Sequence, residues 1–355
     1  MDIKKIVREP IFFEPNRVYR TYLGGAGYEK EFTDKGECVD GSFPEEWVAS
    51  KVKAINPVYF GERDGVAVVK DTKLYFDDLL RDYEKDLCGP YVYDCLVKFL
   101  DSSIRLSFQV HPTKEFSRKH FNSEYGKTES WLVVATRENA KLYFGFKDKI
   151  TKEELSELEE RSEYERDVMG KLLHGVEARV GDIWLIKAGL IHAIGAGCTV
   201  IEVQEPTDFT IQPERWIGDY HVSYEEEYIG LDKSTALDAI NYDIYGDNAV
   251  RYAKVTPRVV IDEGNYKKEV LIDYADTTCF AENRHLIKKG GSFTPTFAPC
   301  VYICLSGEGE IKGDSYTRKI KKGEYFFLPY SARGKFEITT DSEVELIECL
   351  PSKQD

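Results

Sequence analysis

Long apolar runs, basic clusters and methionine are all scarce in this sequence. Only 2 of its 355 residues are Met, and its formal net charge is −15. No block of five or more basic residues occurs, so the chain offers no positive surface for nucleic acid or an anionic membrane. No stretch approaches the roughly 18 apolar residues of a membrane span, and the N-terminus lacks the apolar segment of a secretory signal.

Paired cysteine motifs are absent as well. The 8 Cys residues form no CxxC pair, and the nearest two are Cys300 and Cys304. This spacing favours free thiols in a reducing compartment. Together with the missing signal and span, it predicts a soluble protein of the cytoplasm, either a monomer or a homodimer.

Aromatic residues are plentiful, and they favour strands. Aromatics make up 13% of the chain, with 23 Tyr and 19 Phe, and such side chains pack well on pleated surfaces. Two stretches, VGDIWLIKAGLIHAIG and KKGEYFFLPYSARGKF, share a plan of Gly, an acid, an apolar strand and a small-residue turn. Because the second copy lacks His, we expect two related β-barrels, of which only the first binds metal.

The predicted domains are residues 1–265, a metal-binding domain, and residues 266–355, a second barrel without metal. Helical insertions are expected near 78–89, 151–173 and 216–265. Thr151 and Glu154 fit a capping box at the start of the second insertion. The segment from Ser103 to Pro112 alternates apolar and polar residues, which predicts a strand.

Four side chains, distant in the sequence, suit a metal site. Gln109 and His111 are two apart on the predicted strand and therefore point the same way. Glu129 starts the next predicted strand, and His192 lies in a Gly-rich turn. Each would be unremarkable alone. Together they offer two imidazole nitrogens and two oxygens, which suits Zn²⁺ or another divalent transition metal.

The same residues carry a resemblance to a known family. QVHP, GKTESW and GLIHAIGAG, in this order and separation, resemble the motifs of type I phosphomannose isomerases, and FPEEWVAS resembles that family's Glu-x-Trp-x-x-Ser segment. The resemblance implies two cupin-type jelly-roll barrels and a zinc-dependent interconversion of mannose 6-phosphate and fructose 6-phosphate through a cis-enediol. It implies a metal held by Gln109, His111, Glu129 and His192, and active-site roles for Ser107, Lys127, Glu202 and Asp208.

Two positions depart from the family pattern. Gln212 stands four residues after Asp208, where the family usually carries Arg, and a neutral amide cannot replace a guanidinium. Lys187 replaces the Pro of a Pro-Ala-Gly turn. We therefore expect Lys187 or Arg215 to supply the missing charge beside the sugar phosphate, with Gln212 still in contact with the substrate.

The departures leave three alternatives open. The chain could be a related cupin isomerase for another sugar or sugar phosphate, or a non-catalytic, metal-containing sugar-binding protein. An iron-dependent cupin dioxygenase fits less well, because such sites usually combine a facial triad with open positions. Sequence alone does not rank Glu202 and Asp208 as the general base.

Overall fold

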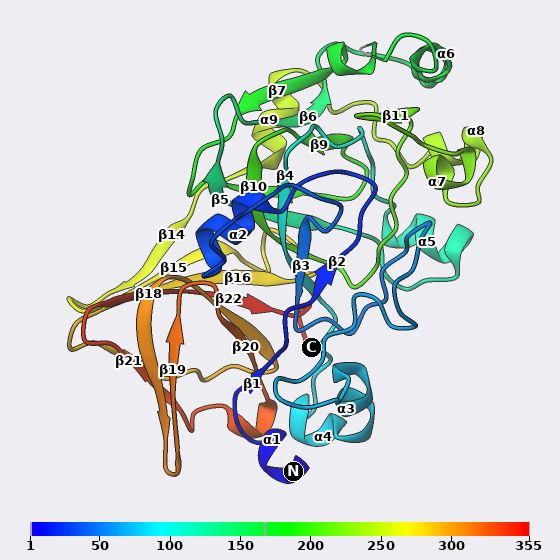
Figure 1. Ribbon diagram of the computed structural model, residues 1–355. Helices are drawn as coiled ribbons and strands as arrows, with labels where there is room; N and C mark the ends of the chain where they lie inside the picture. Colours follow the sequence, from blue (N-terminus) through cyan, green and yellow to red (C-terminus); the bar gives the residue numbers. More distant parts are fainter. Residues whose placement is uncertain (1, 167, 355) are drawn as a thin grey trace.

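The protein is mainly β, with short helices on the connections between strands. The computed structural model describes residues 2–166 and 168–354 (Figure 1). Two large antiparallel sheets dominate the molecule, one from each half of the chain. The prediction of a mainly β protein with helical insertions is confirmed. No helix in the described ranges is long and apolar enough to cross a membrane.

The sheet of the first half has seven strands within the described residues, in the order β13-β8-β5-β10-β4-β3-β2. These are β2 (Arg17–Val18), β3 (Glu45–Val48), β4 (Leu96–Ser102), β5 (Glu129–Thr136), β8 (Ile183–Ile186), β10 (Cys198–Gln204) and β13 (Lys254–Val255). Two smaller sheets accompany it. Their strands are β6 (Lys141–Phe146), β7 (Leu173–Glu177) and β9 (His192–Ile194), and the pair β11 (Trp216–Ile217) and β12 (Tyr220–His221).

The second large sheet has ten strands in the part of the chain that the structure describes. They are β1 (Ile11–Phe12), β14 (Arg258–Asp262), β15 (Tyr266–Ile272), β16 (Ala281–Lys288), β17 (Ser292–Phe293), β18 (Cys300–Gly313), β19 (Tyr316–Lys321), β20 (Tyr325–Leu328), β21 (Glu337–Thr339) and β22 (Glu343–Leu350). The N-terminal strand β1 pairs with β20, placing Ile11 opposite Phe327. The first residues of the chain therefore complete the sheet of the second half.

The helices are short and lie mostly where insertions were predicted. They are α1 (Ile3–Ile6), α2 (Ala26–Phe32), α3 (Phe76–Asp82), α4 (Glu84–Leu87), α5 (Lys114–Phe121), α6 (Lys152–Ser162), α7 (Tyr224–Tyr228), α8 (Lys233–Leu237) and α9 (Asp247–Ala253), with 3₁₀ turns at Met169–Lys171 and Tyr330–Ala332. The capping box of Thr151 and Glu154 is present at the start of α6. The helix ends at Ser162 rather than near residue 173, and Leu173 instead pairs with Phe146 in the β7–β6 ladder.

The strand predicted from Ser103 to Pro112 is wrong as a regular strand. The segment forms only isolated bridges, between Gln109 and His192 and between Val110 and Ile211. Upstream of them, the Phe108 N–H donates to the Glu214 carboxylate at 2.8 Å. Apolar alternation records which side chains are buried, but it does not reveal whether a neighbouring strand is present to form a ladder.

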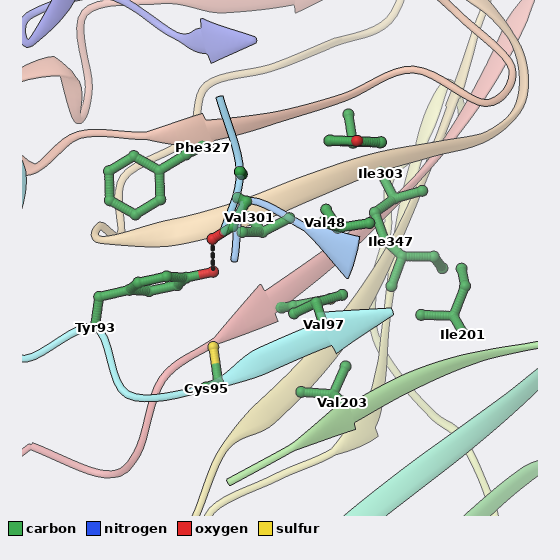
Figure 2. Close-up of a cluster of buried hydrophobic side chains, with 14 of the residues drawn as sticks. Val48, Tyr93, Cys95, Val97, Ile201, Val203, Val301, Ile303, Phe327 and Ile347 are labelled. Atoms are coloured by element: carbon green, nitrogen blue, oxygen red, sulfur yellow. Dashed lines mark hydrogen bonds between the residues drawn. The ribbon is translucent and has the colours of Figure 1, made fainter. Parts of the chain in front are cut away.

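One hydrophobic core joins the two large sheets. Figure 2 shows Val97 and Val203 from the first sheet facing Val301 and Ile347 from the second, and all four side chains are fully buried. The opposite face of the first sheet carries a separate cluster that includes Trp131. That inner face also holds the polar residues described below.

Truncation at the joint between the sheets should destabilise the whole fold. For Val301→Ala we expect the free energy of unfolding to fall by roughly 2 kcal/mol or more, because two buried methyl groups are lost and a cavity remains. Urea unfolding of the metal-free protein measures this. Val260→Ala is the matched control, since Val260 is 50% exposed on β14. Equal losses for the two variants would contradict the assignment of this core.

Candidate active site

Three buried side chains from separate segments meet on the inner side of the first sheet. His111 follows the extended segment, Glu129 begins β5 and His192 begins β9. Their donor atoms all lie within 4.8 Å of one another, and each residue is at most 1% exposed. Glu129 Oε2 lies 3.0 Å from His111 Nε2, and Glu129 Oε1 lies 3.4 Å from His192 Nε2.

The backbone fixes these positions. Gln109 and His192 exchange both N–H···O=C bonds at 2.9 Å, so the extended segment is tied directly to β9. Gln109 lines the adjoining cavity. On the other side, Glu129 pairs with Gln204 of β10 and with Ile186 of β8. The carboxylate is therefore held in the middle of the sheet, facing the two imidazoles.

The ring orientations fit a metal ion. His111 Nδ1 donates to the Phe209 carbonyl at 2.9 Å, and His192 Nδ1 donates to the Leu190 carbonyl at 2.8 Å. These bonds place the proton on Nδ1 of each ring and direct the Nε2 lone pairs toward Glu129. Both Glu129 oxygens and His192 Nε2 are buried without a hydrogen-bond partner, which is costly unless another group satisfies them. A divalent cation would do so.

The protonation states of His111 and Glu129 also suit the binding of a divalent cation. Burial, and next the neighbouring Lys127, lower the pKa of His111 to about 3, so the ring is neutral and its Nε2 lone pair can accept from Lys127 or bind a cation. Burial alone would raise the pKa of Glu129, but Lys127 and His111 outweigh it and hold that pKa well below its usual value. The metal-free site thus contains a carboxylate anion beside the neutral imidazole of His111.

Acid should destabilise the metal-free protein through His111. Below about pH 6.5 the unfolded chain binds a proton on this ring that the folded protein does not accept until about pH 3. The free energy of unfolding is therefore expected to fall as the pH drops through this interval. Denaturant unfolding of chelator-treated protein at several pH values measures it. His111→Gln should show a shallower fall between pH 6.5 and 5, and an unchanged slope would contradict the neutral ring.

A cavity of about 600 Å³ opens beside the cluster. Lys127 connects the two, because it lines the cavity while its Nζ lies 3.0 Å from His111 Nε2 and 3.3 Å from Glu129 Oε2. Ser107, Glu202 and Asp208 line the same cavity. The structure thus brings these predicted site residues to one place.

Two ion-pair systems organise the cavity wall. Arg20 binds both oxygens of Asp208 at 3.0 Å and also contacts Glu45 at 3.0 Å. Lys98 lies 3.2 Å from Glu202, its direct neighbour across the β10–β4 ladder. The first sheet therefore presents alternating acids and bases toward the cavity from β3, β4 and β10.

The two candidate bases differ in their surroundings. Burial raises the pKa of Glu202, and the nearby Glu129 adds to this effect while Lys98 opposes it. For Asp208, burial is outweighed by Arg20, which lowers the pKa of this carboxyl. Asp208 also accepts the Ile55 N–H at 3.0 Å. Glu202 is thus the acid whose proton affinity is raised, and Asp208 is a firmly held anion.

The remaining predicted residues separate into two groups. Gln212 lines the cavity, where its Oε1 accepts from the Ser107 hydroxyl at 2.7 Å. Lys187 and Arg215 are not among the residues that line it. Lys187 Nζ lies over the Tyr252 ring at 5.3 Å. Arg215 pairs with Glu159 at 2.6 Å and Glu227 at 2.8 Å, which hold it among the helices α6 and α7.

Sequence reasoning missed Arg20, Glu45 and Lys98 as cavity residues. A signal for Lys98 existed: it is the one basic residue in the strand LVKFLDS, and it is only 2% exposed. A buried Lys inside an apolar strand requires a carboxylate partner. Glu45 lies in the FPEEWVAS segment already noted, whereas nothing around Arg20 marked it.

Comparison with known proteins supports the family resemblance that the motifs indicate. No protein-family model matches the chain. A mannose-6-phosphate isomerase of Bacillus subtilis is 25% identical over 342 residues, which cover 93% of this chain and 96% of that protein. One from Streptococcus mutans is 29% identical over 208 residues, covering 57% of this chain and 59% of its own. The resemblance to phosphomannose isomerases that the sequence predicted is confirmed.

Solved structures show the same fold. The crystal structure of a mannose 6-phosphate isomerase from Bacillus subtilis matches with a TM-score of 0.73 at 20% identity, covering 95% of this chain and 99% of that one. A phosphomannose isomerase variant from Salmonella typhimurium gives 0.70 at 14% identity, covering 97% of this chain and 100% of its own.

Proposed function

We propose, from the likeness of this chain to mannose-6-phosphate isomerases over most of its length, that it is a metal-dependent aldose–ketose isomerase. It would interconvert a mannose-type aldose and the corresponding ketose through a cis-enediol. Mannose 6-phosphate and fructose 6-phosphate are the reference pair, because the relatives are named for this substrate.

The observation that carries the proposal is the orientation of the buried cluster. His111 and His192 both donate Nδ1–H to backbone carbonyls and face Glu129 with Nε2. Gln109, on the bridge to His192, completes the proposed ligand set. Zn²⁺ or another divalent transition metal held there would supply Lewis-acid stabilisation of the negative charge that develops on the sugar oxygens.

Glu202 is the general base that we propose. Isomerisation moves a proton between C1 and C2, and a group whose pKa is raised toward neutrality is suited to accept and return it. Glu202 lines the cavity, and its pKa is raised by burial. Lys98 lies beside it at 3.2 Å and balances its charge while it is ionised.

The other cavity residues position the sugar. The Lys127 ammonium faces both the cluster and the cavity, so it can donate a hydrogen bond to a substrate oxygen near the reacting carbons. Asp208, fixed by Arg20, accepts hydrogen bonds from sugar hydroxyls, and Ser107 and Gln212 form a neutral pair beside it. None of these roles requires the residue to change protonation.

The proposal extends to the architecture and location of the protein. We propose two cupin-type jelly-roll barrels, residues 1–265 and 266–355, supported by the separate hydrophobic clusters inside each half. Two strands from outside residues 266–355, β1 and β14, also join the sheet of the smaller barrel. A cytoplasmic location is supported by the free thiols of the eight cysteines, and a monomer or homodimer is part of the same proposal.

Isomerase assays with and without a chelator test this function. Purified protein is incubated with mannose 6-phosphate or D-mannose, and the ketose product is measured before chelation, after it, and after adding back Zn²⁺, Mn²⁺, Fe²⁺ or Co²⁺. We expect turnover that chelation abolishes and one of these ions restores. Metal binding without turnover of either sugar would favour the non-catalytic sugar-binding alternative.

A further inference from the structure

Acidic side chains outnumber basic ones in the lining of the active-site cavity. We infer that the natural substrate is an aldose without a phosphate, and that Gln212 and the acids around it determine this specificity. The inference rests on the proposed isomerase function and narrows its substrate class. It follows from how each charged side chain of the cavity is already engaged.

The cavity lining is acidic. It contains three basic side chains, Arg20, Lys98 and Lys127, and five carboxylates, Glu45, Glu202, Asp208, Glu225 and Glu226. A phosphate monoester adds about two negative charges at neutral pH. Unless a cation offsets them, a carboxylate near such a group is repelled by several kcal/mol at the moderate dielectric of a protein surface.

Each basic residue of the cavity already has a carboxylate partner. Arg20 is bound by Asp208 and Glu45, Lys98 by Glu202, and Lys127 by Glu129 at 3.3 Å. Among the described lining residues, none is a free cation. Recognition of phosphate ordinarily relies on Arg or Lys with donors available to the ligand. The donors of Arg20 and Lys98 would first have to leave a buried acid unpaired, and Lys127 faces the metal cluster at the reacting end of the cavity.

Two arginines close to the cavity are also engaged by carboxylates. Arg105 is bound by Glu214 through both nitrogens of its fork, and its guanidinium lies over the Phe108 ring. Arg215 is held by Glu159 and Glu227. The start of α7 reaches the cavity through Ser223, but the Glu226 carboxylate already accepts the Ser223 N–H at 3.0 Å. The Glu226 carboxylate of the same helix therefore occupies the position at which a phosphate would accept from this N–H.

Neutral groups stand where a sugar hydroxyl would be recognised. Gln212 accepts from Ser107 and donates Nε2–H to the Glu226 carbonyl at 3.3 Å. The Asn56 amide nitrogen is buried in the lining without a partner. Ser107 is only two residues from Gln109, at most about 7 Å along the chain. The neutral pair and the proposed metal ligand thus lie within reach of one small sugar.

Steady-state kinetics with two substrates test the inference. With the metal-loaded enzyme, we expect kcat/KM for D-mannose to exceed that for mannose 6-phosphate by at least about tenfold, because the phosphate meets unpaired carboxylates. A ratio of one or below would overturn the inference and leave the isomerase function standing. Failure of both sugars with every metal offered would instead overturn the proposed function, and the inference with it.

A gain-of-function variant gives the sharper test. Gln212→Arg places a guanidinium beside Ser107 and the Glu226 carbonyl, both of which can accept its hydrogen bonds. We expect kcat/KM for mannose 6-phosphate to rise by roughly tenfold or more, since a charge-assisted bond replaces a neutral contact. Thr256→Arg, at an exposed position outside the cavity, adds the same charge and should change neither substrate.

A second variant tests the same inference independently, in case Gln212→Arg impairs folding. Glu225 is exposed at the cavity edge, so Glu225→Gln removes one negative charge with little structural change. We expect kcat/KM for mannose 6-phosphate to increase several-fold relative to that for D-mannose. Glu263→Gln, an exposed acid on the β14–β15 turn, is the matched control. Unchanged discrimination in both cavity variants would contradict the role assigned to these charges.

Discussion

Replacing Glu129 by Gln is expected to abolish metal binding and to lower isomerase turnover by more than about 100-fold. Loss of an outer partner of a metal ligand typically costs 10–100-fold, and Glu129 supplies the only anionic donor of the proposed set. The neutral amide also leaves Lys127 without its carboxylate partner. Metal content per chain and kcat/KM for both sugars are the measurements.

A matched control separates this effect from general damage. Glu263→Gln makes the same chemical change at an exposed position and should retain full metal content and activity. Circular dichroism of Glu129→Gln should show the same strand content as the wild type, because the rest of the sheet is unchanged. Near wild-type activity with metal retained in Glu129→Gln would contradict the account.

Replacing Glu202 by Gln is expected to lower kcat by roughly 10²–10⁴-fold, the usual contribution of a general base. Metal content should remain near the wild-type value, because Glu202 contacts Lys98 rather than the cluster. Exchange of the C2 proton with solvent deuterium should slow by a similar factor. This combination of lost proton transfer and retained metal separates a base from a ligand.

Asp208→Asn provides the comparison for Glu202. Asp208 is a firmly held anion with its pKa lowered mainly by Arg20. Its loss should raise KM and destabilise the Arg20 arrangement while proton exchange at C2 continues. If Asp208→Asn stops this exchange and Glu202→Gln does not, the assignment of the base is reversed.

The metal cluster could be predicted from the sequence because its residues lie in or next to predicted strands and recognisable motifs. His111 and Glu129 flank predicted strands, and the motifs around them resemble a known family. The pairing that brings Gln109 beside His192 is a single bridge, which no periodicity reveals. Resemblance therefore supplied the grouping, and the structure supplied the directions of the ring nitrogens.

The ion pairs of the cavity could not be predicted in the same way. Arg20 and Asp208 are 188 residues apart, and Lys98 meets Glu202 only because β4 and β10 are neighbours in one register. Arg215 was expected beside the substrate since it is near Asp208 in sequence. The structure places it against Glu159 and Glu227, two buried acids that do not line the cavity.

The position of β1 shows a similar limit at the level of the fold. Ile11 and Phe12 form a strand too short for its pairing partner to be predicted from the sequence. They pair with β20, near the far end of the chain. Helix α6 was located correctly at its start because a capping box is local. Leu173 was expected near the end of the same insertion but pairs with Phe146 in a sheet, a non-local contact that local patterns do not reveal.

The most direct test is a crystal structure of the metal-loaded protein with anomalous scattering measured at the absorption edge of the bound metal. The account predicts one ion, about 2.0–2.2 Å from Nε2 of His111, Nε2 of His192, a Glu129 oxygen and the Gln109 side-chain oxygen. An anomalous peak elsewhere, or an ion held without His111 and His192, would contradict it.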